Sequence, residues 1–408
     1  MSLELRSIRP DELRAVAAAT RTSFGVPMPD DFALDGWRGH ELDRVVAAFD
    51  GPQVVGTGRN YSLELTLPGG TVVPAAGVSW IGTLPTHRRR GVLRSMLHVL
   101  FDDATTRREP VAILNASEGG IYRRFGFGEA TFSAAIEVDR ATAALRDADV
   151  PGRVRLVTRA DARERFPDLF DRARFAQPGA VSRPPSWWGH QYFDADSSGP
   201  VARYEAVYED SSGRADGYVA YEISAAWSEN VPSSGLSVRD LLALTPDAYQ
   251  ALWSYLVGVD LVQTITSFNA PVDGALRWLL IDSRAMRTKR VGDWLWVRVL
   301  DTARVLRERR YAVDGSLVLE VRDHHRPGAG ADGCFELAGG PDGAACETTS
   351  RAPELVLDVA ELGSILLGGV APSTLATAGL LEVREPAALG RADAMFRSTP
   401  QPFSMTWF

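Results

Sequence analysis

The stretch that decides the fold is Val78-Ser-Trp-Ile-Gly-Thr-Leu-Pro-Thr-His-Arg-Arg-Arg-Gly-Val-Leu-Arg94. It reads as a short apolar strand, a break at Pro85, a basic loop that ends on Gly91, and the start of a helix. Apolar residues then recur at three- and four-residue steps, which gives the predicted helix one apolar face: Val92, Leu93, Met96, Leu97, Leu100 and Ala104. The basic loop therefore enters a helix whose first backbone N–H groups lack intrahelical partners.

Such a helix entry favours phosphate. The unpaired amides and the positive end of the helix dipole attract an anion, and so do the guanidinium groups of Arg88, Arg89, Arg90 and Arg94. Gly91 would let the anion approach the backbone. A solvated basic run is the alternative for three arginines alone. A nucleic-acid patch is disfavoured, because acidic residues outnumber basic ones (52 to 44) and the basic cluster is local.

The loop Arg89-Arg-Gly-Val-Leu-Arg94 after a strand resembles the pyrophosphate-binding motif of the GNAT acyltransferases. The longer string from Leu84 to Arg94 is similar to that of the Eis (enhanced intracellular survival) proteins. By this resemblance the strand before the loop splays open and binds the pantetheine arm of acetyl-CoA through Ile81, Gly82 and Thr83. The resemblance also implies that six residues face the pyrophosphate: Arg89, Arg90, Gly91, Val92, Leu93 and Arg94.

A second motif follows the compact apolar run from Val111 to Ser117, which is typical of a buried parallel strand. The segment Ser117-Glu-Gly-Gly-Ile-Tyr-Arg-Arg-Phe-Gly-Phe127 resembles the second GNAT motif, in which a tyrosine stands four residues before a glycine and an aromatic. The resemblance implies that Ser117 and Glu118 contact acetyl-CoA and that Tyr122 protonates the departing thiolate. A phenol of pKa ~10 suits a thiol of pKa ~8.5. The alternative is a core tyrosine whose hydroxyl bonds to backbone.

Composition is that of a soluble globular protein with a net charge of −8, and 408 residues indicate two or three domains. No signal peptide, membrane-spanning run or membrane partner is expected. Cys334 and Cys346 are too few for a disulfide scaffold, so the cytoplasm is the expected compartment. Adjacent His324 and His325 would point their rings to opposite sides, so no metal site is expected.

The predicted fold class is α/β (α+β), with two tandem GNAT-like domains, the second degenerate, followed by a sterol-carrier-like α/β domain. Residues 44–58 and 61–74 are predicted as two hairpins, 134–138 as the end of the first sheet, and 291–300 as one strand. Between residues 154 and 257 the order strand, helix, paired strands, strand, helix repeats without a second arginine–glycine loop. The last part, with strands at 317–322, 334–337 and 354–358, resembles the terminal domain of Eis proteins. The expected domains are 1–138, 139–300 and 301–408.

The resemblance implies an acetyl-CoA-dependent N-acetyltransferase whose acceptor is a small cationic amine, aminoglycoside- or polyamine-like. It also implies that the main-chain carboxylate of Phe408 takes part, as a base, as an anchor for the ammonium, or through water. A terminal carboxyl of pKa ~3.5 is badly matched as a base unless burial raises its pKa. The aromatic ending at Trp407 and Phe408 favours burial, and a frayed terminus is the alternative.

In GNAT folds the helices after the first strand flank the acceptor site, so Phe24 and Trp37 are candidate pocket walls, with core packing as the alternative. Acidic residues line the Eis acceptor pocket, and the candidates here are Asp30, Asp31 and Asp35. Trp407, and not an acid, stands beside the last residue, which speaks against aminoglycoside preference.

Two other function classes stay open: a protein-lysine acetyltransferase and a non-catalytic acyl-CoA- or lipid-binding module. The resemblance further implies a homo-oligomer, a hexamer.

Overall fold

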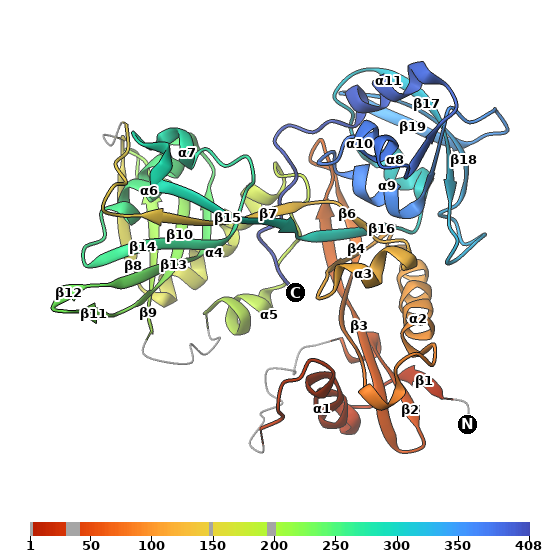
Figure 1. Ribbon diagram of the computed structural model, residues 1–408, viewed down its shortest axis with the longest axis horizontal. Helices are drawn as coiled ribbons and strands as arrows, with labels where there is room; N and C mark the ends of the chain where they lie inside the picture. Colours follow the sequence, from red (N-terminus) through yellow and green to blue (C-terminus); the bar gives the residue numbers. More distant parts are fainter. Residues whose placement is uncertain (1–2, 30–40, 147–149, 194–200) are drawn as a thin grey trace. The chain divides into compact units, whose positions relative to one another are not determined.

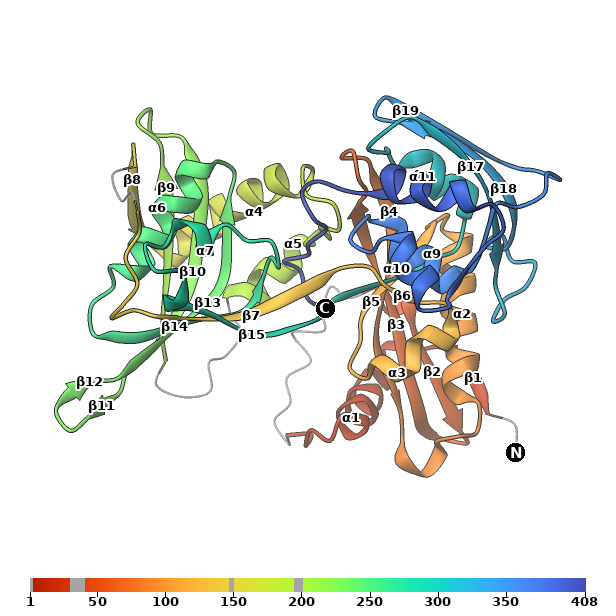
Figure 2. The ribbon, with the colours of Figure 1, turned by 45° about the horizontal axis from the view of Figure 1, so that its top comes forward.

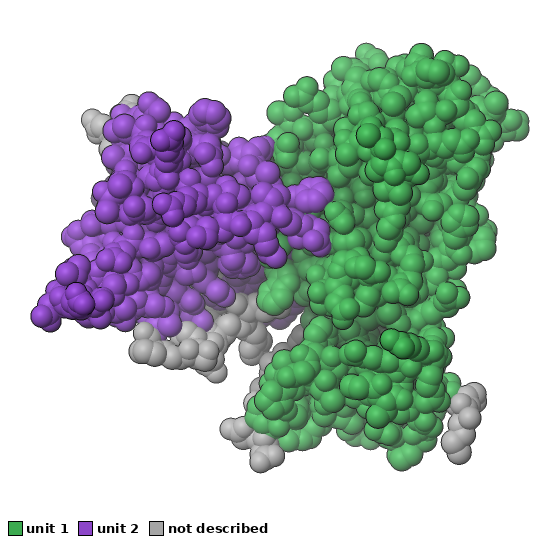
Figure 3. All heavy atoms as spheres, viewed as in Figure 1, with its two compact units in different colours: residues 1–131, 294–402, 407–408 green, residues 132–293, 403–406 purple. Residues whose placement is uncertain are grey.

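The computed structural model describes residues 3–29, 41–146, 150–193 and 201–408 (Figures 1 and 2). The chain divides into two compact units, which Figure 3 distinguishes by colour. Unit 1 comprises residues 1–131, 294–402 and 407–408, and unit 2 comprises residues 132–293 and 403–406. Each unit is built around its own seven-stranded sheet.

The first sheet of unit 1 has the strand order β1-β2-β3-β4-β5-β16-β6. Its strands are β1 (Glu4–Ser7), β2 (Val45–Asp50), β3 (Gln53–Thr66), β4 (Val72–Thr83), β5 (Val111–Asn115), β16 (Leu295–Val299) and β6 (Gly128–Glu129). Both predicted hairpins are confirmed, since β2 pairs with β3 from Asp50↔Gln53 and β3 pairs with β4 from Thr66↔Val72, but they share β3 as one unbroken strand and β4 continues to Thr83. Asn60, which lies between the two predicted hairpins, is fully buried in this continuous strand and donates from Nδ2 to Leu100 O at 2.8 Å.

Two helices carry apolar residues into the cores formed with this sheet. In α1 (Leu13–Ser23) the buried residues are Leu13, Val16, Ala17, Ala19 and Thr20. In α2 (Val92–Thr106) they are Val92, Met96, Leu97, Leu100, Phe101 and Ala104, with Leu93 partly buried. The apolar face predicted for α2 is therefore confirmed. In the described part of the chain, no helix combines the length and apolar character needed to cross a membrane.

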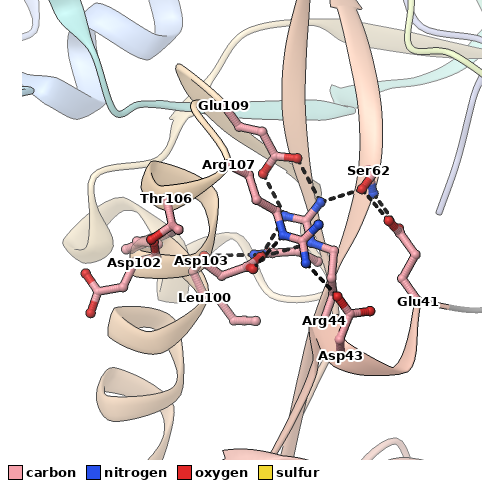
Figure 4. Close-up of polar contacts among 12 residues, drawn as sticks. Glu41, Asp43, Arg44, Ser62, Leu100, Asp102, Asp103, Thr106, Arg107 and Glu109 are labelled. Atoms are coloured by element: carbon pink, nitrogen blue, oxygen red, sulfur yellow. Dashed lines mark hydrogen bonds and ion pairs between the residues drawn. The ribbon is translucent and has the colours of Figure 1, made fainter.

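A buried ion network fixes the far end of α2 (Figure 4). The Arg44 side chain is fully buried and donates to both carboxylate oxygens of Glu109, at 2.7 and 2.6 Å. Its Nε donates to Asp103 at 2.9 Å, and Asp103 also accepts from Asn60 and Arg107. Because burial disfavours a lone carboxylate, the pKa of Glu109 is raised, and the Arg44 guanidinium opposes that shift. The network ties β2, β3, α2 and the entry to β5 together.

The rest of unit 1 is a five-stranded sheet of order β19-β18-β17-β20-β21. Its strands are β17 (Gly315–Arg322), β18 (Gly333–Gly340), β19 (Gly343–Thr348), β20 (Leu355–Asp358) and β21 (Leu381–Val383). Its helices are α8 (Thr302–Glu308), α9 (Val359–Leu366), α10 (Pro372–Thr377) and α11 (Pro386–Phe396). The predicted pairing of 317–322 with 334–337 is confirmed as the antiparallel β17–β18 ladder.

Unit 2 repeats the first topology with the strand order β8-β9-β10-β13-β14-β7-β15. Its strands are β8 (Arg153–Val157), β9 (Val201–Glu209), β10 (Ala215–Ser224), β13 (Ser234–Ala243), β14 (Val262–Ala270), β7 (Phe132–Asp139) and β15 (Met286–Asp293). Its main helices are α4 (Arg159–Arg174) and α6 (Pro246–Val257). The β13–β14 pair is parallel, as is β4–β5 in the first sheet.

Two strands lie in a different sheet from the one predicted. The strand at 134–138 does not finish the first sheet, because β7 pairs with β14 and β15 in unit 2. The single strand expected at 291–300 is two strands, of which β15 belongs to unit 2 and β16 pairs with β5 and β6 in unit 1. Alternating apolar residues predict a strand but do not specify its partner, so the sequence pattern could not assign these two strands to a sheet.

Candidate active site

The first sheet of unit 1 opens between two parallel strands. Strand β4 pairs with β5 only from Ala75 to Gly77, and then continues to Thr83 along β3. A register shift in β3 and the left-handed backbone of Trp80 (φ 55°) bend β4 at this point. Beyond Gly77, β4 no longer pairs with β5, so its peptide groups on that side face the opening.

The predicted pantetheine segment, Ile81, Gly82 and Thr83, forms the end of this bent strand. A Cβ on Gly82 would lie 2.8 Å from Cβ of Ser23 in α1, so only glycine lets the helix approach the strand here. Ile81 packs over Gly58 in the same way, since a Cβ there would lie 2.8 Å from Ile81 Cδ1.

The arginine loop leads from β4 into α2. After a 3-10 turn at Pro85–His87, Arg89 and Gly91 both have left-handed backbones, with φ of 63° and 81°, and Gly91 is the N-cap of α2. Left-handed residues in such a loop turn neighbouring backbone N–H groups toward one side, and a concave nest of this kind suits a phosphate. No atom lies within 4 Å of the position of a Gly91 Cβ, so the nest faces open space.

His87, whose role the sequence did not indicate, connects this loop to Asp50 at the end of β2. It is buried, with Nδ1 2.8 Å from Thr86 Oγ1 and Nε2 3.2 Å from Asp50 Oδ2. Arg88, Arg89, Arg90 and Arg94 are exposed around the helix entry. The loop therefore presents exposed guanidinium groups, of which that of Arg90 also lies 3.9 Å from Asp50, and this is the arrangement that pyrophosphate recognition needs. The residues present fit the pyrophosphate of an acyl-CoA.

Tyr122 lies on the one-turn helix α3 (Gly119–Tyr122), which follows the end of β5. Its side chain is buried and its ring meets Phe127 edge-on at 6.1 Å. Burial raises the pKa of Tyr122, and a side-chain hydrogen bond with Ser117 opposes this shift. The phenol therefore keeps its proton at neutral pH. Ser117 and Glu118, predicted to contact the cofactor, are exposed just before the helix.

The turn after Tyr122 is held by the C-terminal part of unit 1. A Cβ on Gly126 would overlap Arg298 and lie 2.7 Å from Val359 Cγ1, and a Cβ on Gly128 would overlap the Ala360 carbonyl. Arg298 Nη1 donates to Phe125 O at 2.6 Å. This close packing explains why the motif places glycine on both sides of Phe127.

Two ion pairs secure the same turn. Arg298, fully buried on β16, pairs with the buried Asp323, and Arg123 pairs with Glu361 at the start of α9. Burial raises the pKa of Glu361, and the Arg123 charge opposes this shift. The carrier-like part of the chain thus supports the turn that carries Tyr122.

Phe408 lies at the same opening of the first sheet. Its backbone N–H donates to Asn115 Oδ1 at 3.4 Å, and Asn115 is the last residue of β5. Its ring meets Tyr61 edge-on at 6.3 Å and lies over Gly77, where a Cβ would be 3.1 Å from Phe408 Cε2. The carboxyl carbon of Phe408 is two bonds from its amide nitrogen, so it lies near the end of β5, seven residues before Tyr122.

Phe408 joins an aromatic cluster that the sequence did not single out. Tyr61 on β3 also meets Trp80 edge-on at 6.3 Å. The fully buried Arg59 places its guanidinium carbon 3.7 Å from the Tyr61 ring centroid and 4.5 Å from that of Trp80. Trp80 has a left-handed backbone, of which the sequence showed no sign because a tryptophan does not indicate such a conformation.

Of the two predicted pocket walls, Phe24 lies in the described part of the chain. Phe24 caps the end of α1 and is 51% exposed, so it is not a core residue. Trp37 and the candidate acids Asp30, Asp31 and Asp35 lie outside the described residues.

Comparisons with known proteins agree with the domain types. Residues 4–130 and 179–305 each match an acetyltransferase (GNAT) domain family, and residues 302–405 match a sterol carrier protein domain. The chain is 38% identical over 416 residues to an N-acetyltransferase of Streptomyces griseus, with 99% of each chain covered. It is 36% identical over 359 residues to the N-acetyltransferase Eis of Mycobacterium bovis, with 85% of this chain and 84% of that protein covered.

The chain belongs to the Eis-like GNAT N-acetyltransferases. The crystal structure of Eis1 from Mycobacterium abscessus superposes with a TM-score of 0.87 at 34% identity, covering 99% of this chain and all of Eis1. A GCN5-related N-acetyltransferase from Anabaena variabilis has the same fold, with a TM-score of 0.86 at 20% identity over both whole chains. The predicted enzyme class and the two GNAT domains followed by a sterol-carrier-like domain are thus confirmed. GNAT acetyltransferases use acetyl-CoA as the acyl donor.

Proposed function

We propose that this Eis-like enzyme transfers the acetyl group of acetyl-CoA to an amine of a small cationic acceptor, aminoglycoside- or polyamine-like. Tyr122 serves as the general acid, and the main-chain carboxylate of Phe408 serves as the base or as the anchor of the amine. One observation carries the proposal: the amide of Phe408 bonds to Asn115 at the end of the strand that leads to Tyr122. An acid and a carboxylate are thereby available at one opening of the sheet.

The proposed roles follow from the local chemistry. The nest at Arg89 and Gly91 binds the pyrophosphate of acetyl-CoA, and the free edge of β4 at Ile81 to Thr83 hydrogen-bonds its pantetheine arm. When bound, acetyl-CoA supplies the activated thioester. Tyr122 keeps its proton because burial raises its pKa, and donates that proton to the sulfur as the carbon–sulfur bond breaks.

The acceptor must arrive as a neutral amine or lose a proton at the site. The Phe408 carboxylate would hold the ammonium form by charge and accept its proton directly or through water. Tyr61 meets the Phe408 ring edge-on, and the Arg59 guanidinium already lies over the rings of Tyr61 and Trp80, so the proposal assigns the charge of the acceptor to the Phe408 carboxylate. We expect the acids at 30, 31 and 35 to add to this preference. A homohexamer is the expected assembly by family resemblance.

The test combines two variants with a panel of amines. Tyr122→Phe should lower kcat by ~10²–10⁴-fold with the Kd for CoA unchanged. An extension of the chain beyond Phe408 should abolish turnover, because each added residue moves the terminal carboxylate by ~3.5 Å. A matching extension before Met1 is the control. Release of CoA measured with aminoglycosides, polyamines and a lysine peptide then identifies the acceptor class. Equal turnover of the two extended proteins would eliminate the carboxylate.

A further inference from the structure

The sheet of unit 2 opens in the same way as the sheet that holds the proposed active site. Strands β13 and β14 pair in parallel up to Val238↔Ser267, and both continue beyond that pair without further pairing to each other. Asn269 stands two residues past the last pair on β14. In the first sheet, Asn115 likewise stands two residues past the last parallel pair, Gly77↔Ile113. The two asparagines occupy equivalent positions of the repeated fold.

Residues 403–406 of the chain's own C-terminal segment lie at this second opening. Asn269 Nδ2 donates to Ser404 O at 3.1 Å, whereas Asn115 Oδ1 accepts from Phe408 N in the first sheet. Phe403 N–H donates to Pro178 O at 2.9 Å, and Thr406 Oγ1 donates to Val181 O at 2.8 Å. The side chains of Ser404 and Thr406 are fully buried, so the segment is held along its length.

Arg183 connects this segment to β13. Its side chain is fully buried and donates from Nη1 to Asp240 Oδ2 at 2.6 Å, and the Tyr218 hydroxyl donates to the same oxygen at 2.9 Å. Arg183 also donates to the C-terminal segment 403–406, which we call the tail: Nη2 lies 3.1 Å from Met405 O, and Nε lies 3.4 Å from Thr406 Oγ1.

Aromatic rings enclose this guanidinium on several sides. Its carbon lies 4.0 Å from the Tyr192 ring centroid, 4.1 Å from that of Phe170 and 5.1 Å from that of Trp188. Met405 is partly buried against the same aromatic core. A buried cation with a fixed carboxylate partner and two contacts to one peptide segment is a built binding site for that segment.

We propose that the degenerate GNAT-like domain is a peptide-binding domain for residues 403–406, and that Arg183 and Asn269 are positioning residues for Phe408. The segment bonds to Asn269 on β14, and Arg183 links it to Asp240 on β13, where the two strands no longer pair with each other. Since the stretch from 154 to 257 also lacks a second arginine–glycine loop for a pyrophosphate, this domain would hold chain and not acyl-CoA, and the enzyme would bind one acetyl-CoA per chain. The positioning part of the proposal rests on the proposed role of Phe408.

The physical reason lies in the short distance along the chain. Only Trp407 separates Thr406 from Phe408, and Trp407 is 64% exposed and so contributes little anchoring of its own. A slip of the segment by one residue would move the Phe408 carboxylate by ~3.5 Å, more than catalysis tolerates. Fixing residues 403–406 therefore fixes the register of the last residue.

The test measures the tail directly in the full-length protein. Hydrogen–deuterium exchange of a C-terminal peptide covering 403–408 should be about tenfold faster or more in Arg183→Lys than in the wild type. The lysine keeps the charge near Asp240 but loses the forked contacts to Met405 and Thr406. The isosteric Asn269→Asp, which replaces the Nδ2 donor by a carboxylate oxygen, should speed exchange similarly. The control is Arg172→Lys, because Arg172 pairs with the buried Asp216 at 2.8 Å in the same unit and has no described contact to the tail.

Activity and binding measurements complete the design. Both tail variants should lose about tenfold or more in kcat while the Kd for CoA stays unchanged, and calorimetry should give one CoA per chain. If the rate of hydrogen–deuterium exchange at 403–408 is the same in folded Arg183→Lys and Asn269→Asp proteins as in the wild type, the peptide-binding role is overturned. Faster exchange with unchanged kcat would support that role and overturn the positioning of a catalytic Phe408, so the two failures are distinguishable. Binding of two CoA molecules per chain would also overturn the proposal.

Discussion

Replacement of Arg298 by methionine tests how far the C-terminal part of unit 1 supports the proposed acid. Arg298 is 1% exposed, donates to Phe125 O at 2.6 Å and pairs with the buried Asp323. Methionine fills similar volume without charge or donors. The substitution therefore leaves the Asp323 carboxylate and the Phe125 carbonyl without this partner, while the side chain of Tyr122 itself is not altered.

The magnitude follows from what stays buried. Removal of one partner of a buried ion pair destabilises a protein by about 3–5 kcal/mol. Asp323 Oδ1 still accepts from the backbone N–H groups of His325 and Arg326, both at 3.0 Å, so we expect the lower end, about 3 kcal/mol. For a unit of this size that corresponds to a fall in Tm of about 6–12 °C. We also expect kcat to fall by about tenfold or more, because the turn that carries the phenol loses its anchor.

The assay is a double-mutant cycle read by thermal unfolding and by turnover. Adding Asp323→Leu to Arg298→Met removes the buried carboxylate that has lost its ion-pair partner, so the double variant should regain most of the lost Tm. Its kcat should stay low, since Phe125 O still lacks the Arg298 donor. Arg304→Met is the control, because Arg304 is partly exposed and pairs with Glu308, a pair worth about 0–1 kcal/mol. A single variant within 2 °C of the wild type in Tm, or strictly additive effects in the cycle, would refute the reasoning.

Three further predictions concern stability, pH and the donor loop. Arg44→Met removes the guanidinium that pairs with the carboxylates of Glu109 and Asp103. The free energy of unfolding measured in urea titrations should fall by about 3–5 kcal/mol, and a loss below about 1 kcal/mol would contradict the network. Burial, with the Arg298 charge, lowers the pKa of His325 from 6.5 to about 4, so the unfolded chain binds its proton first and stability is lost as pH falls from 6.5 to 4. His325→Asn should flatten that slope, and an unchanged slope would assign the effect to other groups. Gly91→Ala strains a backbone of φ 81°, and calorimetry should show CoA affinity reduced about tenfold with Tm lowered only slightly; unchanged affinity would remove the loop from the donor site.

The sequence by itself determined the features that depend on residues close along the chain. The apolar face of α2 follows from its 3.6-residue period, and the left-handed Gly91 at its entry follows from the arginine–glycine motif. The helix α6 begins as local capping rules predict, because Oγ1 of Thr245 accepts from Ala248 N at 3.1 Å. The loop and the helix entry together predict a phosphate site within a few residues, and the resemblance of the two motifs to those of GNAT proteins identified the enzyme class.

Tertiary structure alone decided which distant segments meet. An alternating strand buries one face in any sheet, so the pattern at 132–139 and 295–299 could not reveal that β7 lies in the second sheet and β16 in the first. The glycines at 126 and 128 are required by Arg298 and Ala360, more than 150 residues away, and Arg183 binds a carbonyl 222 residues further on. Such contacts are specific in space but carry no signal in spacing, because the chain between them can be of any length. The place of Phe408 beside Asn115 is of this kind: its aromatic character predicted burial, and only the fold determined where.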